Sequence, residues 1–485
     1  MFPINEIYHL EDELIVVAID AYMHKCHFQK VGNEYIQTGP SNSTAAGPGA
    51  MRSIVVSAPG ENGNGGGTCV RVSDHSTTPE SITNTYKPTF DTIRSRVRTA
   101  LKPFHNIPEP DEINSACEGL QGIVVRLNVA AEGEDGRDPS GMRPALHSAR
   151  AAAQNLFNGL AFDNLRKQVP ETINTILAYR ALTGCLLAAL TAEKQVMEDS
   201  HEAVKNSISS AIEGCKALMA KSEAGNLVVT LKIISNVISV VQTILGAKGA
   251  TNLARGLTLA DSIADELLFV LSDKVIEGSI KSFFENPFAS VDAVISELES
   301  AVEQINSDAY ELEEANRLAL SDTIAAVTSQ SSRGRFALDL EPLISSDLDG
   351  DLTIQNVPQA RDVANSHLPD VADALRGIEK DLMALNLTDP LYRTGEFSMS
   401  PKGPASDVFE MQLLIRDLLR DLSTEVDDCA LNLLATINAF LINEGKQVDL
   451  ISRYKIDAST VRAEMDSSAN DKIARDRNPW FRYDL

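Results

Sequence analysis

The feature that most constrains this chain is an apolar repeat with a helical period that runs from about residue 142 to residue 225. After residue 159, apolar side chains return every three or four positions, as they do on the buried face of a helix. A continuous helix of this length would extend on the order of 90 Å at ~1.5 Å per residue, too long for one small domain. We therefore expect a rod with helical partners along its length. Pro170 predicts a kink or a new helix start within the repeat, and Gly225 predicts its end.

The composition favours helices over a β-sandwich. Hydrophobic residues make up 43% of the 485 residues but aromatic residues only 5%, whereas strands are enriched in aromatic and β-branched side chains. Further helical periods cover residues 5–28, 89–104, 111–129, 257–271, 291–327, 358–385 and 407–443. Two β-prone runs, residues 53–57 and 68–72, flank a glycine-rich stretch and predict a β-hairpin. The predicted fold is mainly α: an elongated helical bundle of long antiparallel helical hairpins, with a small β-hairpin near the N-terminus.

Changes in composition and period divide the chain into successive segments. In order, they are an N-terminal helix with the glycine-rich β-hairpin (1–85), a long helical hairpin (86–225), a hydrophobic helix with a helical connector (226–330), an acidic linker (331–357), a C-terminal helical hairpin (358–450) and a charged tail (451–485). The linker is rich in Ser, Gly and Asp, which are typical of turns and loops.

The charge argues against two classes of partner. The formal net charge is −25, and nucleic acids and anionic lipid headgroups are themselves negative. No run rich in Lys and Arg offsets this charge locally. The acidity is enough to keep a long helical protein soluble.

The sequence predicts no enzyme. It contains no His-Glu-x-x-His, Gly-x-Ser-x-Gly or Gly-Lys-Ser/Thr motif, so no catalytic residue or cofactor is expected. His24 and His27 share a helix face, but no second cluster supplies the remaining ligands of a zinc site. The six cysteines lie far apart without a Cys-x-x-Cys pair, and four of them lie on predicted apolar helix faces. They are expected to be buried free thiols.

One short stretch resembles the turn of a known family. Phe157, Asn158, Gly159, Ala161 and Leu165 follow the pattern of the Trp-x-Gly turn of the WXG superfamily, in its long actinobacterial form. Phe157 stands where the family has Trp, and Leu165 stands at its later Phe position. In such a turn the aromatic ring packs between two helices, and the glycine adopts a backbone conformation that a side chain would penalise.

The resemblance covers about residues 86–222 and implies a non-enzymatic substrate or component of a type VII (ESX) secretion system. Its partners would be proteins, such as a secretion ATPase or a helical heterodimer partner, and oligomers would be compatible with this role. Acidic residues precede the first short apolar run, so no signal peptide is predicted. The protein would then be secreted, or reach the cell envelope, by a route that needs no signal peptide.

Export signals on such substrates have the spacing Tyr-x-x-x-Asp/Glu. Tyr310 and Glu314 have this spacing on a predicted helix, and they are the candidate signal. Two other pairs have the same spacing: Tyr8 and Asp12 within the first predicted helix, and Tyr392 and Glu396 outside the predicted helices.

The most hydrophobic stretch of the chain is compatible with functions other than secretion. Residues 227–245 are close to bilayer-spanning length, but their polar members fall on one stripe, which is more typical of a core or interface helix. The alternatives are an α-helical pore-forming toxin that inserts this helix, and a cytoplasmic helical scaffold. Near the C-terminus, Trp480, Phe481 and Tyr483 either form a docking peptide or cap the C-terminal bundle.

Overall fold

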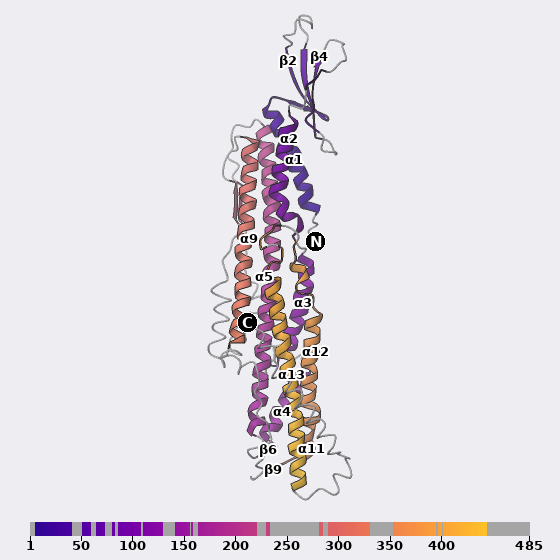
Figure 1. Cartoon of the computed structure of the whole chain (residues 1–485), viewed down its shortest axis with the longest axis vertical. Coiled ribbons are helices and arrows are strands. Elements are labelled where there is room, and N and C mark those ends of the chain that lie inside the picture. The colour runs from indigo at the N-terminus through magenta and orange to yellow at the C-terminus, as the bar shows by residue number, and fades with distance from the viewer. Residues whose placement is uncertain are drawn as a thin grey trace.

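In the computed structural model the chain forms a rod of long helices with a small sheet at one end (Figure 1). The structure describes residues 5–40, 51–59, 65–72, 80–82, 86–107, 110–129, 141–155, 157–158, 163–220, 229–232, 281–284, 290–329, 353–393, 396–399 and 401–443. Most of these residues are helical, and the strands are short. The predicted fold class, an elongated helical bundle with a small β element near the N-terminus, is confirmed.

Helix α5 (Asp163–Met219) runs along the rod, and other helices pack against it over its whole length (Figure 1). Its 57 residues extend about 85 Å at 1.5 Å per residue. Pro170 lies inside this helix, so the prediction that it begins a new helix is wrong. Proline removes one backbone hydrogen bond, and the buried side chains of Leu165 and Val169 stabilise the helix on its N-terminal side.

The half of the rod nearest the sheet is a bundle of helices around the C-terminal half of α5. The other members are α1 (Asn5–Lys25), α2 (Lys87–Leu101) and α9 (Val291–Thr328). Ion pairs join their outer edges: Lys205 of α5 lies 2.5 Å from Glu6 of α1, and Arg96 of α2 lies 2.6 Å from Glu299 of α9. Surface pairs of this kind contribute little stability, so the apolar stripes between the helices hold this bundle together.

The other half of the rod is a bundle around the N-terminal half of α5. Its members are α3 (Pro110–Arg126), α4 (Met142–Asn155), α12 (Leu368–Ala384) and α13 (Ala405–Asn443). A short 3₁₀ turn, η1 (Lys102–Asn106), joins α2 to α3. Helices α2 and α3 therefore follow each other along the rod, and the two bundles stack end to end.

The predicted hairpin of residues 358–450 corresponds to α12 and α13, which pack against each other. Helix α12 does not begin at residue 358. It follows α11 (Val357–Asp362) and a π-helical turn (Val363–His367), and Asn356 caps α11 by accepting a hydrogen bond from the Gln359 amide at 3.2 Å. The short connection η5 (Asp389–Leu391) lies in the loop between the two long helices.

The sheet at the end of the rod is antiparallel. Its strands run in the order β1 (Gln29–Val31), β2 (Glu34–Pro40), β3 (Met51–Ser57), β4 (Thr68–Val72) and β5 (Glu80–Ile82). The pairing of β3 with β4 is the predicted hairpin. Tyr35 anchors the sheet to α1, because its buried hydroxyl donates to Asp20 at 2.6 Å. Its ring also packs edge-on against Phe90 of α2.

Two short strand pairs join distant parts of the chain. Strand β6 (Phe157–Asn158) pairs with β9 (Thr353–Ile354), and β7 (Val229–Lys232) pairs with β8 (Lys281–Phe284). The prediction of a helix over residues 227–245 is therefore wrong for the part that the structure describes, since Val229–Lys232 is a strand. Val229 and Thr230 are β-branched, and pairing with β8 satisfies the backbone groups that a helix would have paired internally.

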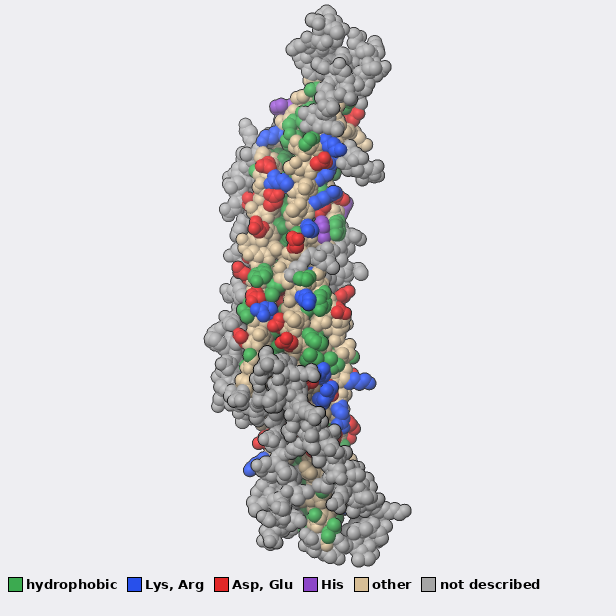
Figure 2. Space-filling view, viewed as in Figure 1, with side chains coloured by type: hydrophobic (Ala, Val, Ile, Leu, Met, Phe, Trp, Pro, Cys, Tyr) green, Lys and Arg blue, Asp and Glu red, His purple; other side chains and the backbone are tan. Residues whose placement is uncertain are grey.

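Some sequence predictions fall outside the described residues. They include the helix over residues 257–271, most of the acidic linker and the charged tail. On the face that Figure 2 shows, acidic and basic side chains are interspersed along the helices, with small hydrophobic groups between them.

The stacked bundles predict an extended particle in solution. We expect a radius of gyration clearly larger than ~23 Å, the value that 2.2·N^0.38 gives for a compact domain of this length. Small-angle X-ray scattering measures this quantity directly. A value close to that of a compact domain would contradict the end-to-end stacking of the two bundles along α5.

Candidate functional site

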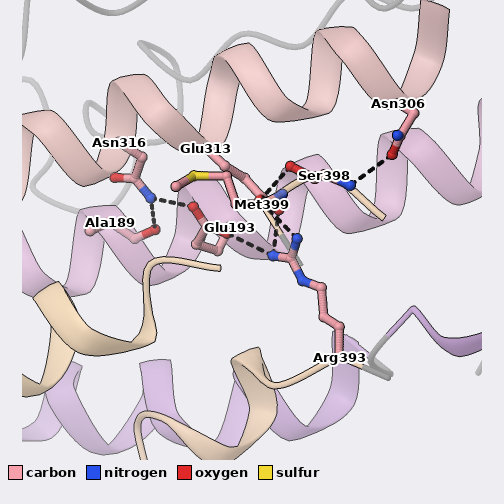
Figure 3. Close-up of polar contacts among 8 residues, drawn as sticks. All are labelled: Ala189, Glu193, Asn306, Glu313, Asn316, Arg393, Ser398 and Met399. Atoms are coloured by element: carbon pink, nitrogen blue, oxygen red, sulfur yellow. Dashed lines mark hydrogen bonds and ion pairs between the residues drawn. The ribbon is translucent and has the colours of Figure 1, made fainter. Parts of the chain in front are cut away.

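Three fully buried charged side chains form a cluster where the two bundles meet. Glu193 comes from α5, Glu313 from α9, and Arg393 from the segment that joins α12 to α13 (Figure 3). Arg393 Nη1 donates to Glu313 Oε2 at 2.7 Å, and its Nη2 pairs with Glu313 Oε1. The same Nη2 lies 3.4 Å from Glu193 Oε2. One guanidinium thus serves two carboxylates.

Polar neighbours complete this ion cluster. Asn316 Nδ2 donates to Glu193 Oε1 at 2.7 Å, so both oxygens of that carboxyl group face a donor. Ser398 Oγ donates to Glu313 Oε2 at 2.5 Å, and the Met399 amide donates to the same oxygen at 3.3 Å. Three of the four carboxyl oxygens therefore accept a hydrogen bond, whereas Glu313 Oε1 has only its ion pair with Arg393 Nη2.

The segment that carries Arg393 has two residues with a positive φ angle close to the guanidinium. Ser398 has φ +49°, which is uncommon for a residue with a side chain, and its amide donates to Asn306 Oδ1 at 2.7 Å. Gly403 has φ +50°, and a Cβ there would lie 2.9 Å from Arg393 Nη2. Phe397 places its buried ring 5.1 Å from the guanidinium carbon. Glycine at 403 is therefore needed both for the turn and for space.

Burial sets the electrostatics of the ion cluster. Removal from water is the largest cause that raises the pKa of Glu193, and the nearby charge of Glu313 raises it as well, while Arg393 and Asn316 lower it. The net effect is a rise of this pKa from 4.5 to about 8. Glu193 therefore favours its protonated form at neutral pH. In that form the cluster carries one negative and one positive charge, which is the neutral arrangement that a buried site favours.

The chemistry of the ion cluster suits positioning better than catalysis. The side chains of Glu193, Glu313 and Arg393 have no exposed surface, so a substrate in solution has no access to them. Among the residues that the structure describes, no group of three or more His, Cys, Asp and Glu is placed to hold a metal ion. What the cluster does is join α5, α9 and the α12–α13 connection at one point.

The residues of the predicted WXG-like turn lie at the junction of α4 and α5. Phe157 and Asn158 form β6, directly between the two helices, and pair with β9. Leu165 is fully buried in the first turn of α5. Gly159 and Ala161 lie outside the described residues.

The candidate export residues lie on the surface of α9. Tyr310 is 48% exposed, and Glu314 forms a hydrogen-bonded ion pair with Arg317 at 2.7 Å. Neither belongs to the ion cluster, although Glu313 is the neighbour of Glu314 in the sequence. The predicted docking residues Trp480, Phe481 and Tyr483 lie outside the described residues.

The cysteines are free thiols, as predicted. Cys185, Cys215 and Cys429 are buried in the helical core, and burial raises the pKa of each to about 12. Their thiolates are therefore strongly disfavoured at neutral pH, which argues against a reactive or metal-binding role for these three.

Among the described helices, α5 is long and apolar enough to cross a membrane by length and composition. In the residues Leu165–Met219, however, 78% of the most apolar window is buried inside the rod. Core helices of soluble proteins commonly meet the same criteria, so this finding gives little support to a membrane span.

The ion cluster was not predicted from the sequence, although the position of Glu193 is unusual for a charged residue. Glu193 falls in phase with the buried Leu186, Leu190 and Met197, so a carboxylate occupies an apolar stripe. A charge at such a position predicts a buried partner. Arg393 gave no comparable signal, because it lies in a loop far away in the sequence.

Comparisons with known proteins add no relative. No protein-family model, no curated protein and no solved structure matches this chain.

Removing the only cation of the ion cluster should destabilise the fold strongly. We expect Arg393→Met to lower the free energy of unfolding by about 3–5 kcal/mol, because two buried carboxyl groups lose their partner. Urea unfolding followed by circular dichroism measures this change. The triple variant R393M/E193Q/E313Q should recover much of the loss, since no uncompensated charge remains.

Arg420→Met is the matched control for this experiment. Arg420 forms an ion pair with Glu379 between α12 and α13, but its side chain is 58% exposed. Its loss should change stability by less than about 1 kcal/mol. Equal effects of the two substitutions would show that the ion cluster has no special role.

Proposed function

We propose that this protein is a non-enzymatic helical rod that acts by binding other proteins, and that a type VII secretion system handles it. The observation that carries the proposal is the hairpin of α4 and α5, whose turn at Phe157–Asn158 lies near one end of the rod (Figure 1). This is the position that the resemblance to the WXG superfamily assigns to the turn.

The packing of the turn supports its role as a structural corner. Strand β9 pairs with β6, so the corner is held by backbone hydrogen bonds as well as by the helices. Leu165 is fully buried one turn into α5, which suits the apolar position that the resemblance assigns to it. A turn of this kind would present both helices to a partner.

The distribution of polar groups supports binding rather than catalysis. In the described part of the chain, the buried ion cluster is paired within itself, and the charged pairs Lys205–Glu6 and Arg96–Glu299 join helix edges. These groups serve the packing of the rod. The net charge of −25 favours a partner whose contact surface is basic or neutral.

Secretion in the native host tests this proposal. Deleting the ATPase of the candidate type VII system should abolish the extracellular protein while leaving its intracellular level unchanged. A protein exported through a cleaved signal peptide should be unaffected and serves as the control. Undiminished secretion in the deletion strain would contradict the proposal.

The export signal has a matched control within the chain. Tyr310 and Tyr392 are almost equally exposed, at 48% and 49%, and each is followed by a glutamate at the fourth position. Of these two tyrosines, only Tyr310 lies on a long helix. We expect Tyr310→Ala to block export and Tyr392→Ala to leave it intact.

A second candidate function, an α-helical pore former, is favoured by one specific observation. Strands β7 and β8 pair with each other and lie against α5 and α9. Their pairing brings together the two ends of residues 233–280, which begin with most of the hydrophobic stretch. Under this second function, the hydrophobic stretch would insert into the membrane while β7 and β8 hold its ends together.

Dye release from liposomes separates the two functions. Under the proposed function, the purified protein should release no dye at neutral or acidic pH. A pore former would cause prompt release that rises cooperatively with protein concentration. Ile234→Asp should abolish such release without unfolding the soluble protein, while Ile234→Val should preserve it. That pattern would replace the proposed function with the second candidate.

A further inference from the structure

The ion cluster joins the connection between α12 and α13 to two long helices. Helices α5 and α9 are long and continuous, and they pack against each other. Arg393, Ser398 and Met399 belong instead to the non-helical connection between α12 and α13. All three reach Glu313 of α9. A single carboxylate therefore holds the connection through three separate donors.

The connection also makes apolar contact with the bundle nearest the sheet. Phe397 is fully buried and packs against Phe104 of η1, with ring centroids 5.4 Å apart. Nearby, Lys102 lies 3.4 Å from Glu396 at the surface. The connection thus lies between the two stacked bundles, and its release would loosen their junction.

The number of charges makes this junction sensitive to one proton. The ion cluster contains two carboxyl groups and one guanidinium, all without contact to solvent. With one proton on Glu193 the cluster is neutral. Without that proton it carries one net negative charge in a medium that solvates charge poorly.

We infer that the ion cluster is a proton-dependent latch: protonated Glu193 keeps Arg393 and residues 396–399 docked between the two bundles, and loss of that proton favours their release. The inference does not depend on the proposed function, because it concerns the stability of the junction alone.

Among the described residues, the side chains that act on Glu193 come from α9 and from the α12–α13 connection. Helix α9 brings Glu313 and the neutral Asn316 to it, and the α12–α13 connection brings Arg393. On α5 itself, the neighbouring Lys194 pairs with Glu198 at 3.5 Å. From α3, the thiol of Cys117 lies 3.8 Å from the Thr191 hydroxyl.

At the start of α13, Asp407 lies 3.8 Å from Arg317 at the rim of the junction. Burial raises the pKa of Asp407 as well, so its titration also contributes to the pH dependence of the junction. The contribution of Glu193 must therefore be measured as a difference between the wild-type protein and a Glu193 variant.

The direction of the effect follows from linkage. The pKa of Glu193 is higher in the docked state than the 4.5 of an exposed glutamate, so undocking releases a proton. The contribution of Glu193 to the stability of the docked state is complete below about pH 4.5 and is lost as the pH rises towards 8. One proton per opening makes the opening constant rise by up to about tenfold per pH unit in this window.

Two backbone amides report on the docked state directly. The Ser398 amide donates to Asn306 Oδ1, and the Met399 amide donates to Glu313 Oε2, so both are protected only while the connection is docked. Their hydrogen exchange, corrected for the intrinsic pH dependence of exchange, gives the opening constant. Amides in the middle of α12, around the fully buried Leu375, are an internal reference in the same protein.

Hydrogen exchange from pH 5 to pH 9 in the full chain tests the latch. In the wild-type protein, the opening constant of the Ser398 and Met399 amides should rise by close to tenfold per pH unit and level off near pH 8. Glu193→Gln keeps the acceptor for Asn316 and should reduce this slope to less than about twofold per unit. Glu379→Gln, at the surface pair with Arg420, should behave like the wild-type protein.

Two results would overturn the inference. The first is a pH-independent opening constant at Ser398 and Met399 in the wild-type protein, which needs no variant to fold. The second is an equal slope in Glu193→Gln. Infrared difference spectra between the two proteins at neutral pH add a direct readout, since the wild-type protein alone should show the carbonyl band of a protonated carboxyl group. A carboxylate band in its place would also contradict the latch.

Discussion

The burial of α5 is the constraint on which the rest of the structure depends. All residues from 181 to 190 are buried, so the helix is covered on every side at its centre. No single helix can cover more than one side of another, and covering an 85 Å helix takes several partners along its length. The two bundles follow from this: each covers one half of α5, and they overlap where its burial is complete.

This overlap explains why a charged cluster lies at the junction. Where one bundle ends and the next begins, a loop must pass through the core, and its backbone polar groups need partners. Glu313 and Asn306 supply acceptors for the amides of the α12–α13 connection, and Arg393 neutralises the carboxylate that this requires. A buried ion pair adds little net stability over an apolar contact. It favours one conformation of the loop, because any other conformation would leave a buried charge without its partner.

The two candidate functions use different parts of this rod. The proposed protein binding and export concern helices α4 and α5 beside their turn and the exposed face of α9. Membrane insertion concerns the residues between β7 and β8, whose strands lie on the outside of α5 and α9. The rod itself serves either function, because its core is closed by its own helices over the described residues. The proton-dependent junction is a property of the rod and is shared by both.

The sequence by itself determined the long helices, since a period of 3.6 residues shows in the spacing of apolar side chains and needs no knowledge of the partner. The β3–β4 hairpin was equally predictable, because two β-prone runs flank a glycine-rich stretch. The strand β7 was not, since its apolar residues suit a helix and a strand alike, and only pairing with β8, about fifty residues away, selects the strand. Of the ion cluster, only Glu193 was predictable from the sequence, because it is a charged residue at a position where the helical repeat expects an apolar one. Its pairing with Glu313 and Arg393 was decided by the tertiary structure, because an ion cluster depends on distances between side chains that lie about one hundred and two hundred residues apart.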